Sequence, residues 1–294
     1  MQTIKDYKKA MGDKLIIHNV SNDFLELNRA QTKWAENACK RASKLTGKNI
    51  THQKVKNRLM SRLLSTNGNT KIDKNEELTA ALTLAPHKLS GFNVCPWSGD
   101  CAFKCIHTSG RMPMVLEHQV VKTLGYFLHP EVFNSQLNRD LINFKILCDK
   151  KGIQGYGRLN TLSDIDFTDI IRSNKGIKFY DYTKSIQRFN SFINGELPLN
   201  YWLTLSRDEF LSVDHIKGII KQGFNVSVVF WLDESNGDTL PKTWEGMPVV
   251  SGENSDNRWK DKRGVIVGLK AKGKARQLPQ GNFVIIDHKG RKYA

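Results

Sequence analysis

The spacing of hydrophobic residues changes along the chain from a helical period to short, strongly apolar runs. In the first 64 residues, apolar side chains recur three or four positions apart, which predicts helices over 31–45 and 52–64. The segment 65–70 that follows is polar and rich in turn-forming residues. We therefore predict a boundary there, between a basic helical region at 1–70 and a larger domain at 71–294.

Beyond this boundary, short apolar runs alternate with amphipathic segments of helical period. We predict strands over 78–84, 155–159, 176–180, 201–205, 225–231, 247–250, 264–269 and 283–286. We predict helices over 113–127, 133–149, 166–173 and 207–222. Strands that alternate with helices imply right-handed crossovers, so we expect an α/β fold whose mainly parallel sheet forms a partial or complete barrel.

Composition narrows the class of protein. With 39% hydrophobic and 25% charged residues among 294, the chain has the make-up of a globular protein, which excludes wholesale disorder. No apolar run of about eighteen residues occurs, so we expect no membrane partner. The first residues lack the apolar core of a signal peptide, and five cysteines are an odd number that does not suit a disulfide framework. Both features indicate a cytoplasmic protein.

Positive charge is the strongest bulk signal, because the formal net charge is +16. Ten Lys or Arg and one acidic residue lie between positions 29 and 62, and seven and one lie between 260 and 276. Charge clustered in this way favours a phosphate-binding surface, and nucleic acid is the expected partner. The candidate contacts are basic side chains of these two segments: Lys54, Lys56, Arg58, Arg62, Lys270, Lys272 and Lys274.

The two N-terminal helices have the pattern of a DNA-binding motif. A glycine turn at Gly47 joins them, and the second helix carries four basic residues, as in a helix-turn-helix. A solvated helical cap on the larger domain is the alternative, since any basic helical hairpin has the same pattern.

Three of the five cysteines lie within eleven residues, at Cys95, Cys101 and Cys105. Ser98 and Gly99 in the first gap allow the backbone to fold the thiols toward one point. Soft thiolate ligands suit an iron–sulfur cluster or zinc. A four-iron cluster normally takes four cysteines, so three would leave one iron without a protein ligand.

Two alternatives remain for this loop. Zinc could be completed by His107 or His87 and serve only to hold the loop. The thiols could also be unliganded and buried, because free cysteine packs like a small hydrophobic residue.

Polar residues follow one predicted strand after another, at the edge where parallel sheets carry their functional groups. We assign Tyr182, Lys184, Asp164 and Ser206 as candidate catalytic residues. We assign Asn160, Ser163 and Glu253 as candidate cofactor-binding residues. Ordinary loops and helix caps have the same composition, and Ser163 and Ser206 could be such caps.

Several separated motifs point to a known family: Asn93-Val94-Cys95-Pro96, Cys101, Cys105, Gly110-Arg111, Arg158-Leu159-Asn160, Ser163-Asp164, Tyr180-Asp181-Tyr182-Thr183-Lys184 and Gly268-Leu269-Lys270-Ala271-Lys272-Gly273. Over roughly 85–285, the chain resembles an uncharacterised bacteriophage protein family of the gene-product-eighty-eight type. The resemblance implies a phage or mobile-element origin, and hence the cytoplasm of an infected host cell. It implies no particular activity.

The order of strand, three-cysteine loop, long helix and repeated strand–helix units also resembles the radical S-adenosylmethionine enzymes. Their usual spacing is C-x3-C-x2-C, whereas this chain has C-x5-C-x3-C. The resemblance implies a 4Fe-4S cluster on Cys95, Cys101 and Cys105, with S-adenosylmethionine bound at the free iron.

We therefore expect a metalloprotein that acts as a radical S-adenosylmethionine-like enzyme on nucleic acid or nucleotides. One alternative is a non-enzymatic DNA- or RNA-binding protein with a structural metal. Another is a nuclease that binds magnesium through Glu253, Asp256 and Asp261, because hard cations prefer carboxylate oxygens.

Overall fold

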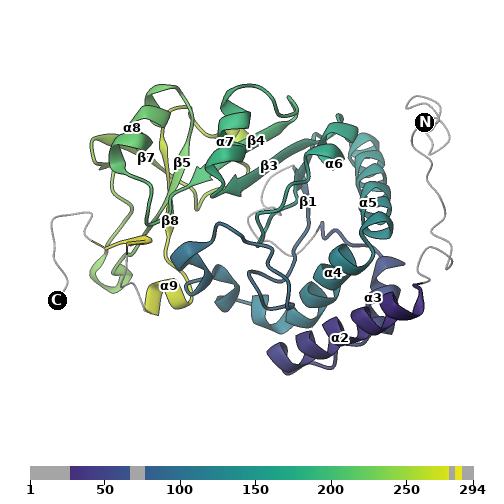
Figure 1. The fold of residues 1–294 in the computed structure, drawn as a ribbon. Helices are drawn as coiled ribbons and strands as arrows, with labels where there is room; N and C mark the ends of the chain where they lie inside the picture. Colours follow the sequence, from purple (N-terminus) through teal and green to yellow (C-terminus); the bar gives the residue numbers. More distant parts are fainter. Residues whose placement is uncertain (1–26, 67–76, 278–281, 287–294) are drawn as a thin grey trace.

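A computed structural model describes residues 27–66, 77–277 and 282–286 of the chain (Figure 1). Its strands are β1 (Leu78–Ala81), β2 (Gly155–Arg158), β3 (Lys178–Thr183), β4 (Tyr201–Ser206), β5 (Val226–Phe230), β6 (Thr243–Trp244), β7 (Met247–Ser251), β8 (Ile266–Lys270) and β9 (Val284–Ile285). Its α-helices are α2 (Arg29–Thr46), α3 (His52–Leu59), α4 (Leu116–Leu128), α5 (Pro130–Lys151), α6 (Thr168–Ser173), α7 (Ile186–Ile193), α8 (Val213–Lys221) and α9 (Lys274–Gln277).

The described strands form one mainly parallel sheet in the order β1-β2-β3-β4-β5-β8-β7-β6, with β9 paired to β5. Only the hairpin of β6 and β7 is antiparallel within this sheet. From β1 to β5 the strands follow one another in sequence order, and a helix lies in each connection, as right-handed crossovers require. This confirms the predicted α/β fold, and the sheet is open, with β1 and β6 at its two ends.

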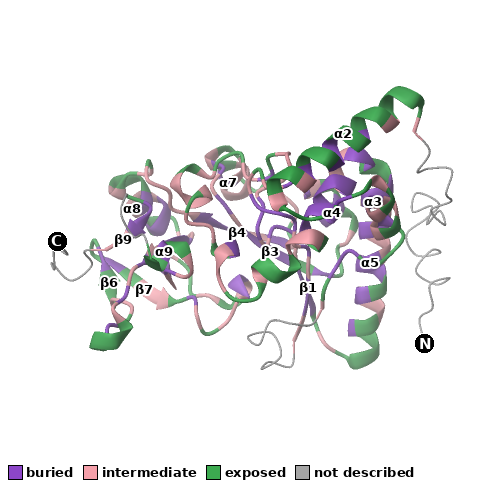
Figure 2. Ribbon diagram, turned by 90° about the horizontal axis from the view of Figure 1, so that it is seen from below, coloured by how far each residue is buried: buried purple, intermediate pink, exposed green. Residues whose placement is uncertain are grey.

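Helices cover one face of this sheet. Helix α5 packs on β1 and β2, α7 on β3 and β4, and α8 on β5. Figure 2 shows buried residues along the strands and on the inner sides of the helices, with exposed residues on the outer sides. The opposite face of β3 and β4 contacts the 3₁₀ turn η6 (Arg258–Lys260), so loops rather than helices cover it there.

The N-terminal helices pack onto the rest of the protein. Helices α2 and α3 both contact α4, and their buried residues Ala38 and Leu59 belong to the same hydrophobic cluster as the strand residues Leu203 and Val226. The predicted domain boundary, between residues 70 and 71, lies outside the described residues and stays a prediction. No helix in the described ranges is both long enough and apolar enough to cross a bilayer.

The second N-terminal helix is shorter than predicted. Helix α3 ends at Leu59, whereas the apolar spacing predicted a helix to residue 64. The amides of Leu63 and Leu64 donate instead to the carboxylate of Asp140 on α5, at 2.5 and 3.1 Å. A buried carboxylate on another helix therefore replaces the helical hydrogen-bond acceptors.

Other element boundaries differ for local reasons. The helix predicted over 207–222 begins at Val213, because Asp208 accepts from the amides of Phe210 and Leu211 and Ser212 caps the helix. The strand predicted over 176–180 runs to Thr183, so Tyr182, which was expected to follow it, lies within β3. The helix predicted from 113 starts as a 3₁₀ turn, η4 (Met112–Val115), and becomes α-helical at Leu116. Helix α7, capped by Ser185, was not predicted.

Candidate functional site

A cavity of about 280 Å³ lies at the carboxyl ends of the parallel strands. Its walls come from the loops that follow β1, β2 and β7 and from the last residues of β3, β4 and β8. This is the edge at which α/β sheets commonly carry ligand sites. The position agrees with the edge expected from the polar residues of the sequence.

Most strand residues that line this cavity share one face of the sheet, and Thr183 and Lys270 at the strand ends are the exceptions. Paired residues in parallel strands point to the same side, as do alternate residues along a strand. The relevant pairs in the register are Tyr182–Thr204, Ser206–Ser227 and Val229–Leu269. Leu203, Leu205 and Val228 point the other way and join the hydrophobic core on the helical side. One face therefore packs the core, and the other faces the cavity.

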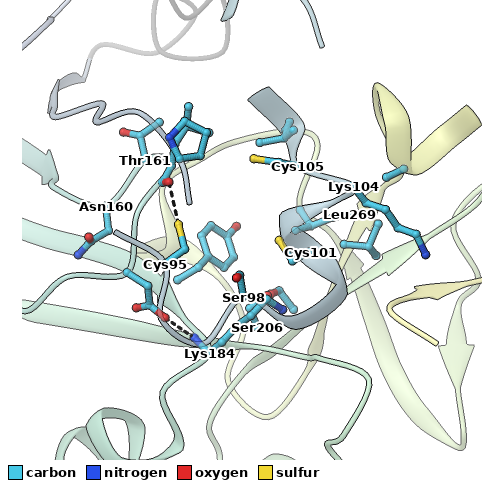
Figure 3. Close-up of a pocket in the computed structure, with 18 of the residues that line it drawn as sticks. Cys95, Ser98, Cys101, Lys104, Cys105, Asn160, Thr161, Lys184, Ser206 and Leu269 are labelled. Atoms are coloured by element: carbon cyan, nitrogen blue, oxygen red, sulfur yellow. Dashed lines mark hydrogen bonds between the residues drawn. The ribbon is translucent and has the colours of Figure 1, made fainter. Parts of the chain in front are cut away.

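All three cysteines of the predicted loop line this one cavity. Cys101 lies in the 3₁₀ turn η2 (Gly99–Ala102), and Cys105 precedes the turn η3 (Ile106–Thr108). Figure 3 shows the sulfurs of Cys101 and Cys105 pointing into the cavity, with Cys95 on the opposite wall. The remaining cysteines, Cys39 and Cys148, are buried in the hydrophobic core on α2 and α5. The structure therefore brings together the three thiols that the spacing singled out.

Backbone contacts fix the shape of the loop. The amide of Cys95 donates to Oδ1 of Asn93 at 3.0 Å, and that of Cys101 donates to the carbonyl of Ser98 at 2.9 Å. Gly99 has a φ of +48°, a left-handed conformation that glycine adopts easily. These short turns are what the small residues between the cysteines predicted.

Burial controls the protonation of the thiols. It raises the pKa of Cys95 to about 12 and that of Cys105 to about 11, and it also raises the pKa of Cys101. The Cys95 thiol donates to the carbonyl of Leu162 at 3.3 Å and accepts from the amide of His87 at 3.4 Å. The burial effect outweighs the nearby ammonium of Lys184 at Cys101, so the thiols are protonated at neutral pH.

The described side chains at this cavity do not form a site for a single metal ion. Within 27–66, 77–277 and 282–286, no three His, Cys, Asp or Glu side chains are grouped so as to hold one metal ion. A tetrahedral zinc site would need its thiolates within roughly 4 Å of one another, since a Zn–S bond is about 2.3 Å. A four-iron cluster binds each thiolate through a different iron and so accepts thiols spread around one cavity. His87 lines the cavity but His107 does not.

The predicted cofactor-binding residues after β2 form a hydrogen-bonded corner of the cavity. Ser163 donates to Oδ1 of Asn160 at 2.8 Å, and the amide of Asn160 donates to the carboxylate of Asp181 at 2.8 Å. Asp164 accepts from the amide of Lys184 at 2.9 Å and forms an ion pair with Arg188. These groups lie at the cavity, but most of their hydrogen-bonding capacity holds the loop in place.

Lys184 lies at the base of the cavity beside Ser206. Its ammonium donates to the Ser206 hydroxyl at 3.2 Å and to the carbonyl of Arg207 at 2.8 Å. Burial lowers the pKa of Lys184, while the neighbouring Cys101 opposes that shift. Tyr182 lines the cavity next to them. The four predicted catalytic residues thus face the same cavity as the thiols.

Glu253 also lies at the cavity, where its carboxylate is already engaged. It pairs with the ammonium of Lys272 at 2.6 Å and accepts from the amide of Lys270 at 3.2 Å. Of the three carboxylates predicted for a magnesium site, Asp256 lines the cavity as well, but Asp261 does not. Asp261 pairs instead with the fully buried Arg258 at 3.1 Å. The magnesium-site arrangement therefore has no geometric support.

The predicted nucleic-acid contacts of α3 do not form one exposed row. Lys54 pairs with Glu117 of α4 at 2.7 Å and also donates to the carbonyl of Asn49. Lys56 and Arg58 are half-buried, and Nε of Arg58 is buried completely. Only Arg62 of these three is exposed. Helix α3 lies against α4 and α5 through Val55 and Leu59, as a helical cap would.

The second group of predicted contacts lies beside the cavity. Lys270 and Lys272 line it, and Lys270 also pairs with Glu234 at 2.7 Å. Lys274 begins α9, and its amide donates to Thr108 of η3 at 2.9 Å. These lysines thus lie close to the cysteine loop.

Three residues of the site were not predicted. Glu209 accepts a hydrogen bond from the amide of Asp100 in the cysteine loop, Arg188 pairs with Asp164, and Arg158 lines the cavity. Arg158 stood in a family motif, but nothing in the residue pattern singled it out. The contacts of Arg188 and Glu209 could not be predicted, because they depend on how α7 and the β4–α8 loop fold against the rest of the chain.

Comparisons with known proteins give one match. The family model described as Gene product 88 matches residues 56–282, which is most of the chain. No curated protein and no solved structure matches it. The family match confirms the gene-product-eighty-eight resemblance seen in the motifs and includes every residue that lines the cavity except Phe283.

Proposed function

We propose, from the premise that this chain belongs to the Gene product 88 family, that Cys95, Cys101 and Cys105 hold a 4Fe-4S cluster. One observation carries the proposal: three thiols from one loop line a single cavity at the carboxyl ends of a mainly parallel sheet. When bound, such a cluster supplies an iron without a protein ligand, at which S-adenosylmethionine can bind and give rise to radical chemistry.

The chain's own residues would bind and orient the reactants. Tyr182, Lys184 and Ser206 lie on the cavity face of the sheet and would contact a substrate there. Lys184 can hold or release a proton at Nζ, since burial lowers the pKa of its ammonium. Asn160 and Ser163, which are bonded to each other, would shape the wall against a cofactor.

A nucleic acid or nucleotide is the proposed substrate class, and the charge of the chain supports it. The net charge is +16, and Lys270, Lys272 and Lys274 lie near the cysteine loop. Polyanion binding that depends on such charges weakens steeply as salt rises. Fluorescence anisotropy with a labelled single strand should therefore show affinity that falls with added salt, and no binding at low salt would contradict this part of the proposal.

Anaerobic purification with metal and sulfide analysis tests the cluster. We expect a brown protein with iron and acid-labile sulfide, and loss of both in Cys95→Ala, Cys101→Ala and Cys105→Ala. Cys39→Ala and Cys148→Ala are the matched controls, because these thiols lie in the hydrophobic core away from the cavity. Equal iron content in all five variants would contradict the proposal.

A colourless protein with one zinc would also overturn the cluster, in favour of a structural metal in a nucleic-acid-binding protein. The remaining alternative, a carboxylate-metal nuclease, would appear as metal-dependent cleavage that survives Cys101→Ala but not Asp256→Ala. Cleavage of S-adenosylmethionine by the reduced protein would extend the proposal from a cluster to an enzyme.

A further inference from the structure

The guanidinium of Arg158 has unused hydrogen-bonding capacity inside the cavity. It lies over the ring of Tyr182, with 5.2 Å between Cζ and the ring centroid. Its Nε is buried without an acceptor, and no hydrogen bond from this side chain reaches another residue in the described parts of the chain. An arginine carries five N–H donors in a planar fork. Arg158 therefore presents a fixed set of donors to whatever occupies the cavity.

Three of the other four cations at the cavity are engaged by described residues. Lys184 donates to Ser206 and to a backbone carbonyl, Lys270 pairs with Glu234, and Lys272 pairs with Glu253. Arg158 thus differs from them in having no such acceptor among the described residues.

The cavity lining as a whole has more cations than anions, which favours an anionic ligand. The cavity lining contains five Lys or Arg and three Asp or Glu, and one of those carboxylates, Asp164, pairs with Arg188 outside the lining. Asp256 is the carboxylate that most affects Arg158. Burial lowers the pKa of Arg158, but Asp256 and nearby tyrosines more than offset this, so the guanidinium stays charged.

We propose that Arg158, supported by the ring of Tyr182, binds an oxyanion group of the substrate in this cavity. A phosphate monoester and a carboxylate share the chemistry that an arginine fork recognises through two parallel hydrogen bonds. The Tyr182 ring packs against the guanidinium, and the cavity of about 280 Å³ has room for such a group with a small organic part. The assignment deepens the proposed function, because it names the part of the substrate that the cavity recognises.

The assignment rests on the proposed function only in using the same cavity, so binding can be measured without the cluster. Isothermal titration calorimetry on full-length, metal-free protein would use inorganic phosphate, adenosine monophosphate and acetate as probes. We expect at least one probe to bind, with affinity about tenfold lower in Arg158→Gln and several-fold lower in Arg158→Lys, which keeps the charge but not the fork. Arg172→Gln, at an exposed ion pair on α6, should bind as the unmodified protein does.

The probes distinguish the two sources of the oxyanion. Binding of phosphate and adenosine monophosphate but not acetate would assign a phosphate, and the reverse would assign a carboxylate. Probes that bind equally well to Arg158→Lys, Arg158→Gln and the unmodified protein, or that bind to none of them, would overturn the assignment. If Arg158→Gln does not fold, Arg158→Lys alone decides.

Metal-free, unmodified protein separates this inference from the proposed function. It should bind the oxyanion probes although it holds no iron. If the protein binds no cluster but still binds the probes through Arg158, the oxyanion site is supported and the cluster is not. An intact cluster without such binding would remove only the oxyanion site.

Discussion

Glu209 in the β4–α8 loop accepts a hydrogen bond from the backbone amide of Asp100 in the cysteine loop, at 2.9 Å. The two residues are 109 positions apart in sequence, yet this contact joins the loop that carries the thiols to the end of β4. The neighbouring Gly99 allows the close approach, since a Cβ on it would overlap with Oε1 of Glu209.

Gly99→Ala should therefore destabilise the protein by about 2–3 kcal/mol, through the clash with Glu209 and the strain of a positive φ. Gly110→Ala is the matched control, because Gly110 also has a positive φ but a Cβ added there would meet no other atom within 4 Å. We expect Gly110→Ala to lower the free energy of unfolding by about 1 kcal/mol, from backbone strain alone. Urea denaturation measures both, and equal losses would show that the Glu209 contact does not matter.

A double-mutant cycle isolates that contact. In a Glu209→Ala background, Gly99→Ala should cost about 1 kcal/mol less than in the unmodified protein, because the clashing carboxylate is gone. Additive free energies of unfolding would contradict the contact.

The thiols of metal-free protein should react slowly with iodoacetamide. Because the pKa of Cys95 is about 12, its thiolate fraction at about pH 8 is roughly a thousandfold smaller than that of an ordinary thiol. Mass spectrometry of the alkylated peptide should show much slower modification of the folded protein than of the urea-unfolded protein. Equal rates in the two states would contradict the raised pKa.

The pair of His52 and His129 should make stability depend on pH. Their Nε2 atoms are 2.9 Å apart, and burial, followed by the charge of His52, lowers the pKa of His129 to about 4. The unfolded state then binds the proton more tightly, so stability is present above about pH 6.5 and is lost as pH falls toward about 4. We expect a loss on the order of 2 kcal/mol, measured by urea denaturation across this range.

His129→Gln should flatten this dependence, while His215→Gln, at an exposed position on α8, should leave it unchanged. An unaltered slope in His129→Gln would show that the pair does not control it.

Protonation of Asp181 should change the free energy of unfolding with pH in the opposite direction. Burial raises the pKa of this carboxyl to about 7, against hydrogen bonds from Asn160 and Tyr201 that favour the charged form. The folded state then binds the proton more tightly, so this contribution to stability falls as pH rises from about 4 to about 7.

Asp181→Asn should remove that contribution, and denaturation midpoints between about pH 4 and pH 7 would show the change in slope. Asp169→Asn on α6 is the control, since that side chain is exposed. If both variants keep the slope of the unmodified protein, the raised pKa of Asp181 is wrong.

Much of the architecture could be predicted from local patterns. The apolar runs at β3, β4 and β5 and the amphipathic period of α2 identified their elements, because packing selects those same positions. The end of α3 could not be predicted, since it depends on Asp140, which is 76 residues beyond Leu64 in sequence. Helix α7 was missed although Ser185 caps it.

The residues that line the cavity could be predicted in part. The cysteine spacing and the polar residues after each strand predicted the residues that meet at the cavity, because carboxyl ends of parallel strands share one edge. The roles of Glu209 and Arg188 depend on loops that approach one another only in the folded chain. Of the predicted nucleic-acid contacts, only those near β8 lie beside the cavity, because charge patterns along a sequence do not reveal which helix face is covered.

The division of the sheet into a helix-covered face and a loop-covered face has an evolutionary consequence. The hydrophobic core between the sheet and α5, α7 and α8 stabilises the fold. Insertions and deletions can therefore occur in the connections that line the cavity on the other face. Relatives of this chain can therefore differ in the molecules they bind with little change in their strands. We expect such differences in the connections that line the cavity, for example in the length of the segment between β7 and β8.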